Sequence, residues 1–454
     1  MGAIINLGED GPGSGIDTTA TDSVSAQRRT SHRKPLVGAY VALVLFMVIY
    51  CARPEDWIPG LSNAPLAKIA GIVTLLALTF SLRHIRNRFP REVTYLFLLI
   101  GQLFLASLLS PVWRGGALLM TVDFAKILLV VVVMTAAINT TRRLRLLIFV
   151  QAASVALIAA VTVLKTPVLG GRLDGMLGGH YSNPNDLALA MVISLPLCLG
   201  QLFLTRKKLW KAAWVLAMLA MVYVVFRTGS RGGFIALTVT VVVCLWHFAI
   251  RGQRRYLLVL VPLAGVIFWL SSGDMLSKRL NQTFESKDTE AYGSSQQRQQ
   301  LVWRSIEITE EHPLFGVGPG NFEQLSGVWH ETHNTFTQMS SEGGLPTLIL
   351  YVLILWHGFA NVRRTKRLAS RHTESRLLAG VLHASLIGYV VGSVFASLGF
   401  EFFPYILVAY TTALLSIAKD TASHSKYSKS VSQLPLGNEA YPRSTELDIS
   451  WQLG

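Results

Sequence analysis

Charged residues are scarce in this sequence of 454 residues. Asp, Glu, Lys and Arg make up 15% of the chain, and hydrophobic residues make up 51%. A soluble domain usually carries about 25% charged residues. The proportions therefore argue against a soluble enzyme and against a disordered scaffold, and they favour a polytopic membrane protein.

Cysteine is also scarce, and each cysteine lies in or at the edge of an apolar run: Cys51, Cys198 and Cys244. Neither a disulfide framework nor a CxxC metal site is available from such a set. The sequence also lacks an internal repeat of fixed period, which argues against a repeat architecture.

Long apolar runs are what the sequence has in abundance. Nearly uncharged segments of about 17–20 residues recur, and each is long enough to cross ~30 Å of hydrocarbon as a helix. We place about twelve such spans, at 36–52, 65–82, 94–110, 124–138, 145–164, 186–204, 210–226, 233–250, 256–271, 345–361, 377–398 and 402–418. The predicted fold is an all-α polytopic membrane protein with one large, partly helical outer loop between spans nine and ten.

The surplus of basic residues follows the predicted topology. Lys and Arg number 41 against 26 Asp and Glu, giving a net charge of +15. If the N-terminus is cytoplasmic, most Lys and Arg fall on the cytoplasmic side, as in other membrane proteins. The charge is therefore a topology signal and does not indicate nucleic-acid binding. We expect a disordered cytoplasmic N-terminus over 1–35, spans over 36–271, an outer loop over 272–344, spans over 345–418 and a cytoplasmic tail over 419–454.

The long outer loop has predicted structure of its own, and long loops without a function are uncommon. An amphipathic helix is expected from Ser295 to His312. The run from Gly316 to Asn321 predicts a tight structural turn that orients two loop helices, because no strand precedes it as in phosphate-binding loops. A short helix is expected from about Asn334 to Glu342, ended by the glycines at 343–344.

Two further outer segments, at 172–186 and 227–233, are unusually polar. Arginines so close to hydrocarbon are costly and tend to be functional, whereas Asn183 is better explained as a helix cap for the sixth span. Both segments should meet the long loop at the outer face and form a cationic pocket with one or two histidines above it. A lipid diphosphate suits such a pocket, because Arg binds phosphate bidentately.

Four segments carry a family resemblance in this order. They are Ser-Asn-Pro-Asn-Asp-Leu-Ala at 182–188, Ser-Arg-Gly-Gly at 230–233, the run at 312–322, and His333-Asn334 together with Glu-Gly-Gly-Leu at 342–345. Together they resemble the O-antigen ligase/polymerase superfamily of bacterial membrane glycosyltransferases. The resemblance covers about 170–360 by motif, and the rest of the chain only by its number of spans.

The resemblance implies transfer of a glycan from undecaprenyl diphosphate to an acceptor hydroxyl at the periplasmic side of the bacterial inner membrane. It implies membrane lipids as neighbours, no cofactor and no metal. The acceptor stays open among lipid A-core in a ligase, a growing polysaccharide in a polymerase, an exopolysaccharide and a protein, with a slight preference for the ligase. With this topology the outer loop is periplasmic and both termini are cytoplasmic.

The resemblance also assigns residues. It implies that His333 is the general base and that the diphosphate is bound by Arg231, Arg298 and Arg172. Arg304 is the alternative to Arg298, and supporting roles are expected among His330, Arg227 and Glu342. Neighbouring arginines should keep the imidazole neutral. A metal held by the two histidines is not expected, because the order His-Glu-Thr-His differs from that of zinc proteases and no third ligand is evident.

Two other classes of function compete with a glycosyltransferase. A secondary transporter commonly has twelve spans, but transporters often show internal repeats and a site in mid-membrane. Here the polar residues gather at the outer surface, and we expect no buried carboxylate in the spans. A non-catalytic component of a polysaccharide-export assembly is the third class, in which replacing His333 with Ala would leave the glycans intact.

Overall fold

The computed structural model describes residues 36–58, 60–61, 64, 66–79, 89–165, 181, 183–271, 290–327, 330–370 and 373–432. The regular structure within these residues is helical throughout, so the all-α prediction is confirmed. The helices are α2 (Val37–Ala52), α3 (Pro54–Trp57), α4 (Leu66–Thr79), α5 (Arg91–Leu108), α6 (Arg114–Ala137), α7 (Thr141–Lys165), α8 (Pro184–Leu204), α9 (Lys208–Thr228), α10 (Arg231–Leu245), the π-helix η3 (Trp246–Ile250), α11 (Leu257–Ser271), α13 (Glu290–Glu311), α14 (Phe322–Leu325), α15 (Thr335–Leu368), α16 (Glu374–Gly392) and α17 (Phe402–Ser432).

Ten helices in the described part of the chain are long and apolar enough to cross a membrane. The segments expected at 65–82 and 256–271 form the apolar helices α4 and α11, whose described lengths are 14 and 15 residues. A spanning helix needs about 20 residues. The prediction of a polytopic membrane protein therefore holds, whereas the count of twelve spans is not confirmed.

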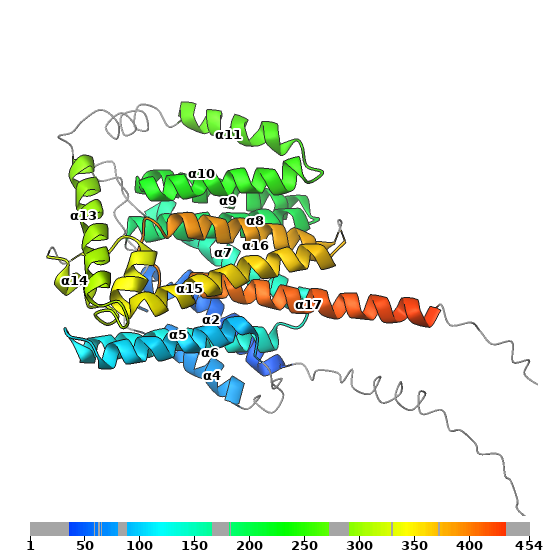
Figure 1. Cartoon of the computed structure of the whole chain (residues 1–454). Helices are drawn as coiled ribbons and strands as arrows, with labels where there is room; N and C mark the ends of the chain where they lie inside the picture. Colours follow the sequence, from blue (N-terminus) through cyan, green and yellow to red (C-terminus); the bar gives the residue numbers. More distant parts are fainter. Residues whose placement is uncertain are drawn as a thin grey trace, which may run out of the picture.

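The long helices lie side by side in one bundle, and α13 stands across one end of it (Figure 1). Helix α8 is central, because it packs against α7, α9, α10 and α16. Helix α15 packs against α5, α16 and α17, and its first turns pack against α13. The outer loop expected over 272–344 thus includes a helix that covers one end of the bundle.

Side-chain caps start three of these helices. Asn183 accepts a hydrogen bond from the backbone N–H of Asn185 at 2.9 Å and so caps α8, as predicted. Ser230 accepts one from Gly233 at 3.1 Å and caps α10. Asn334 caps α15. Such caps satisfy backbone N–H groups that have no partner inside the helix.

A kink divides α15 at Gly344, where φ is 80°. This is the position where the sequence predicted the end of a short helix and the beginning of span ten. A Cβ at Gly344 would lie 2.4 Å from the carbonyl oxygen of Leu314. Glycine is therefore required here both for the backbone conformation and for the close approach of the preceding loop.

The predicted spans hold no buried carboxylate in the described residues, but one lies just before the third span. Glu92, in the first turn of α5, is buried and accepts a hydrogen bond from Nδ2 of Asn361 at 2.6 Å. The helix begins at Arg91, three residues before the predicted edge of the span. The partner that makes burial of Glu92 tolerable comes from α15, and the pairing of distant helices is not visible in the sequence.

Candidate active site

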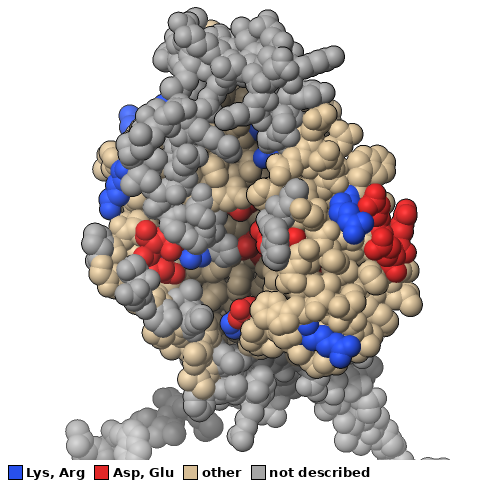
Figure 2. Space-filling view, turned by 90° about the vertical axis from the view of Figure 1, so that its left-hand side faces the viewer, with Lys and Arg blue, Asp and Glu red and all other residues tan. Residues whose placement is uncertain are grey.

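The end of the bundle that carries α13 gathers most of the predicted site. Helices α8, α10 and α15 begin at this end, and hydrogen bonds link the residues at their N-termini to one another and to the α16–α17 connection. Ser230 at the start of α10 donates a hydrogen bond to Oδ1 of Asn185 at the start of α8, over 2.8 Å. Figure 2 faces this end and shows a hollow near its centre, with acidic and basic side chains at its edge.

The turn at Gly316–Asn321 holds the two loop helices together, as predicted. The backbone N–H groups of Val317 and Gly318 donate to the carbonyl oxygens of Ser341 and Glu342, over 2.9 and 2.8 Å. Gly316 has a φ of 61°, and a Cβ there would lie 2.5 Å from the oxygen of Ser341. The turn thus fastens the end of α13 to the segment of α15 before the kink.

His333 lies just before the cap of α15 and has a φ of 52°, in the left-handed region. This conformation is rare for residues other than glycine and costs of order 1–3 kcal/mol. The backbone N–H of His333 donates to Oγ of Ser397 at 2.9 Å, and the hydroxyl of Thr332 lies 2.9 Å from the same oxygen. Ser397, which lies in the connection between α16 and α17, therefore holds the strained segment at His333 in place.

The α16–α17 connection, residues 393–401, also links His333 to the start of α10. The N–H of Thr335 donates to the oxygen of Ser393 at 2.8 Å, and its hydroxyl donates to Ala396 at 2.7 Å. In the same connection Phe395 packs so closely on Gly232 that a Cβ there would approach it to 2.4 Å. His333 and Arg231, the first residue of α10, consequently lie at the same end of the bundle.

The charges around His333 distinguish the two candidate arginines on α13. Desolvation, followed by the charges of Arg298 and His330, lowers the pKa of His333 to about 4. Arg304, by contrast, donates to the carbonyl oxygen of Leu325 at 3.3 Å and to Glu307 at 3.0 Å. Arg298 is therefore the arginine of α13 that acts on the imidazole, which is neutral at pH 7 as expected.

The remaining candidates take different places. Arg231 and His330 are exposed, and Arg227 is half-buried in the last turn of α9 with its guanidinium 5.8 Å from the centre of the Tyr223 ring. Arg172 lies outside the described residues. Glu342 is buried, and the backbone of Gly320 and Phe322 hydrogen-bonds to its carboxylate. The carboxylate of Glu342 therefore supports the turn at Gly316–Asn321.

The carboxylates that act on Glu331, two residues before His333, were not predicted from the sequence. Desolvation of the carboxylate, followed by the charges of Glu323 and Glu401, raises the pKa of Glu331 to about 7. A hydrogen bond with Ser397 opposes this shift. The residue as a whole is nevertheless exposed. The expected cationic pocket is therefore of mixed charge. Glu401 and Ser397 lie more than sixty positions after His333, and no motif in the sequence marks them.

Residues 216–352 match the family model described as O-antigen ligase. Over these residues the match supports the predicted resemblance to the O-antigen ligase superfamily. The matched residues run from α9 into α15 and include Arg231, Arg298 and His333. No curated protein matches the chain. Members of this family are membrane glycosyltransferases of the ligase or polymerase kind, which implies lipid-linked polysaccharide substrates. The apolar helices of this chain agree with a bacterial membrane protein.

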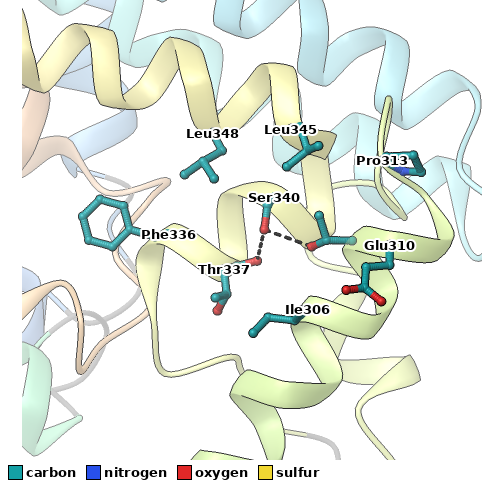
Figure 3. A pocket seen from close by; sticks show the side chains of 9 residues that line it. Ile306, Glu310, Pro313, Phe336, Thr337, Ser340, Leu345 and Leu348 are labelled. Carbon is teal, nitrogen blue, oxygen red and sulfur yellow. Dashed lines mark hydrogen bonds between the residues drawn. The ribbon is translucent and has the colours of Figure 1, made fainter.

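A cavity of about 540 Å³ opens between α13 and α15 (Figure 3). Phe336, three residues after His333 in the sequence, is part of its lining. Its lining is largely apolar and extends past the kink of α15: Ile306, Thr309, Glu310, Pro313, Phe336, Thr337, Ser340, Leu345 and Leu348. Ser340 turns its hydroxyl to Oγ1 of Thr309, at 2.9 Å, and to the backbone of Thr337. The hydroxyls of Ser340 and Thr309 are thus paired with each other, and the apolar part of the wall suits a hydrocarbon chain.

Proposed function

We propose that the protein transfers a glycan from undecaprenyl diphosphate to an acceptor hydroxyl at the periplasmic face of the bacterial inner membrane. The observation that carries this proposal is the position of His333. Its backbone is strained, its N–H is bonded to Ser397, and Arg298 acts on its ring. Strained residues cluster at functional sites, and this one lies inside the segment that matches the O-antigen ligase family.

His333 is the general base in this proposal. As the oxygen of the acceptor hydroxyl bonds to the anomeric carbon, its proton passes to the imidazole. The bond from that carbon to the diphosphate breaks, and its electron pair leaves on the diphosphate oxygen. Base and leaving group lie on opposite faces of the sugar, so the anomeric centre inverts. A positioned general base contributes about 10²–10⁴-fold to such a rate.

Arg298 and Arg231 are the proposed ligands of the diphosphate, with Arg172 as a further contact. Negative charge grows on the leaving group in the transition state, where fixed guanidinium groups stabilise it most. The donor's own charge has a second effect, because it offsets the charge of Arg298. The pKa of His333, about 4 in the free protein, should therefore rise when the donor binds, and the imidazole becomes a stronger base only with substrate present.

The acceptor distinguishes two forms of this proposal, of which a ligase using lipid A-core is preferred over a polymerase of O-antigen or exopolysaccharide. The apolar cavity between α13 and α15 supports a lipid-linked substrate beside His333. It suits the chain of either lipid, so the acceptor must be identified by experiment.

The test is a strain that lacks the protein, with its lipid-linked glycans resolved by length. Long chains that accumulate on undecaprenyl diphosphate indicate a ligase, and single repeats indicate a polymerase. No change in either would contradict the proposal. Complementation with His333→Ala then separates an enzyme from a structural component of an export assembly: normal glycans at a normal protein level would favour the structural role. His312→Ala is the matched control, because His312 lies in the same outer loop and no role in the reaction is assigned to it.

A further inference from the structure

A second cluster of polar side chains lies at the end of the bundle away from α13. Nε2 of His247 lies 2.8 Å from Nδ1 of His383 and 3.4 Å from Nζ of Lys366. The three residues come from η3, α16 and α15, and all three are half-buried. Helix α15 begins next to His333 and reaches Lys366 two residues before its end, so this cluster is separate from the proposed active site.

A π-helix places His247 in the cluster. Helix α10 changes to π geometry at Trp246–Ile250, a rare local widening that is frequent at functional sites. The widened turn packs on α16 at Gly380, where a Cβ would lie 3.2 Å from the Phe248 ring and 3.9 Å from Cβ of His247. The absence of a side chain at Gly380 thus allows His247 to reach His383.

The charges that act on this cluster are all positive within the described part of the chain. Lys366 and Arg251 act on His247, Lys366 and Arg363 act on His383, and Arg376 and Arg251 act on Lys366. Arg376 also donates to the carbonyl oxygen of Lys366 at 3.0 Å. Cations collected around half-buried groups repel one another, and a bound anion would remove that repulsion.

The acidic residue at the start of α16 does not supply that anion. Glu374 lies 3.6 Å from Arg145, at the start of α7, and forms an ion pair with it. It does not appear among the charges that act on His247, His383 or Lys366. Glu374 is thus paired elsewhere, and a bound anion would supply the counter-charge that the cluster lacks among the described residues.

Two exposed tryptophans lie next to the arginines that flank the cluster. Arg251 lies over the ring of Trp246, 4.9 Å from its centre, and Arg363 lies over Trp356 at 5.1 Å. Both tryptophans are exposed on the side of the bundle. Tryptophan and arginine together are typical of the membrane–water interface, where lipid headgroups lie.

We propose that His247, His383 and Lys366 form a binding site for a phosphate group, flanked by Arg251 and Arg363, at the end of the bundle predicted to be cytoplasmic. Lysine and imidazole N–H groups donate to phosphate oxygens, and the guanidinium groups add charge at the rim. The phosphate belongs to an anionic lipid headgroup or to a soluble phosphate ester. The proposal does not depend on the transferase activity at the other end.

The experiment uses the full-length protein in nanodiscs of phosphatidylcholine. Phosphatidylglycerol is added in one arm and inorganic phosphate in the other, and thermal unfolding and retained lipid, by native mass spectrometry, are measured. Stabilisation by both ligands supports a site for phosphate from either source. Stabilisation by the lipid alone assigns a headgroup, and by phosphate alone a soluble ester. No stabilisation by either ligand overturns the proposal.

Single substitutions test whether the stabilisation by phosphate or lipid comes from this cluster. Lys366→Gln keeps the length of the side chain and removes its charge, and we expect about tenfold weaker binding. His383→Gln is the second variant, in case the first fails to fold. The matched control is Lys208→Gln, an exposed lysine at the start of α9 on the same side of the bundle. Equal losses in Lys208→Gln and in both cluster variants would overturn the proposal, because a general surface charge would then account for binding.

Discussion

The two ends of this bundle use the same residue types in different settings. At the α13 end, the charges of Arg298 and His330 act on His333, whose backbone is strained into the left-handed region, and Glu331 lies two residues before it. At the opposite end, His247 and His383 lie in regular α- and π-helices among lysine and arginine alone, within the described residues. Of these two settings, only the first has a histidine with a strained backbone.

Helix direction explains part of this difference. Helices α8, α10 and α15 begin at the α13 end, where their N-terminal partial charges are positive and attract anions. Their C-termini, with partial negative charge, lie at the other end and favour cations such as Lys366 and Arg367 in the last turn of α15. If the proposed diphosphate binds at the α13 end, these helix N-termini add to the few arginines there, whereas the opposite end collects many cations.

The strongest test of the comparison is His333→Ala. We expect the rate of glycan transfer by the purified protein to fall about 10²–10⁴-fold, because the acceptor hydroxyl loses its base. The measurement is transfer from an undecaprenyl-diphosphate glycan, with unfolding followed in parallel. The comparison of the two ends would break if His383→Ala lowered the rate as strongly.

Arg298 and Arg304, six residues apart on α13, sharpen the same comparison. Arg298→Gln should lower the rate about 10²–10³-fold, because a charge that stabilises the leaving group is lost. Arg304→Gln should have a smaller effect, since Arg304 is bonded to Leu325 and Glu307. Equal losses of rate would contradict the assignment of Arg298 to the diphosphate.

The pH profile separates this role of Arg298 from a general loss of structure. Desolvation and the charge of Arg298 lower the pKa of His333 to about 4, so the free protein keeps its base unprotonated well below pH 7. Without that charge the pKa rises towards the reference value of ~6.5. The acid limb of kcat/KM should therefore move to higher pH in Arg298→Gln, and an unmoved limb would contradict the coupling.

The sequence allowed accurate prediction of features that depend on local chemistry. The cap at Asn183, the turn at Gly316–Asn321 and the break near Gly344 follow from neighbouring residues, and the structure confirms them. Ser397 and the pairing of Glu92 with Asn361 depend on which helices become neighbours, and periodicity does not encode that. The sequence alone did not show which of Arg298 and Arg304 faces His333, because that depends on how α13 is rotated about its axis relative to α15.

Gly316→Ala tests whether the α13 end depends on its backbone turn. The positive φ and the contact at 2.5 Å with Ser341 should destabilise the protein by about 1–3 kcal/mol. Gly327→Ala is the control, because Gly327 also has a positive φ, of 77°, but has open space around it. Unfolding in detergent measures both. A loss in Gly327→Ala as large as that in Gly316→Ala would mean that conformation alone, and not the docking of the turn, is responsible.

Ser397→Ala tests how His333 is positioned. Loss of the acceptor for the N–H of His333 should lower kcat by about tenfold, the size expected for one hydrogen bond to a strained segment. KM should stay nearly unchanged, because Arg231 and Arg298 still bind the donor. Ser397→Thr keeps the hydroxyl and should restore most of the rate. Failure of threonine to restore it, or a rise in KM with kcat intact, would mean that the α16–α17 connection shapes the substrate cleft and does not hold the base.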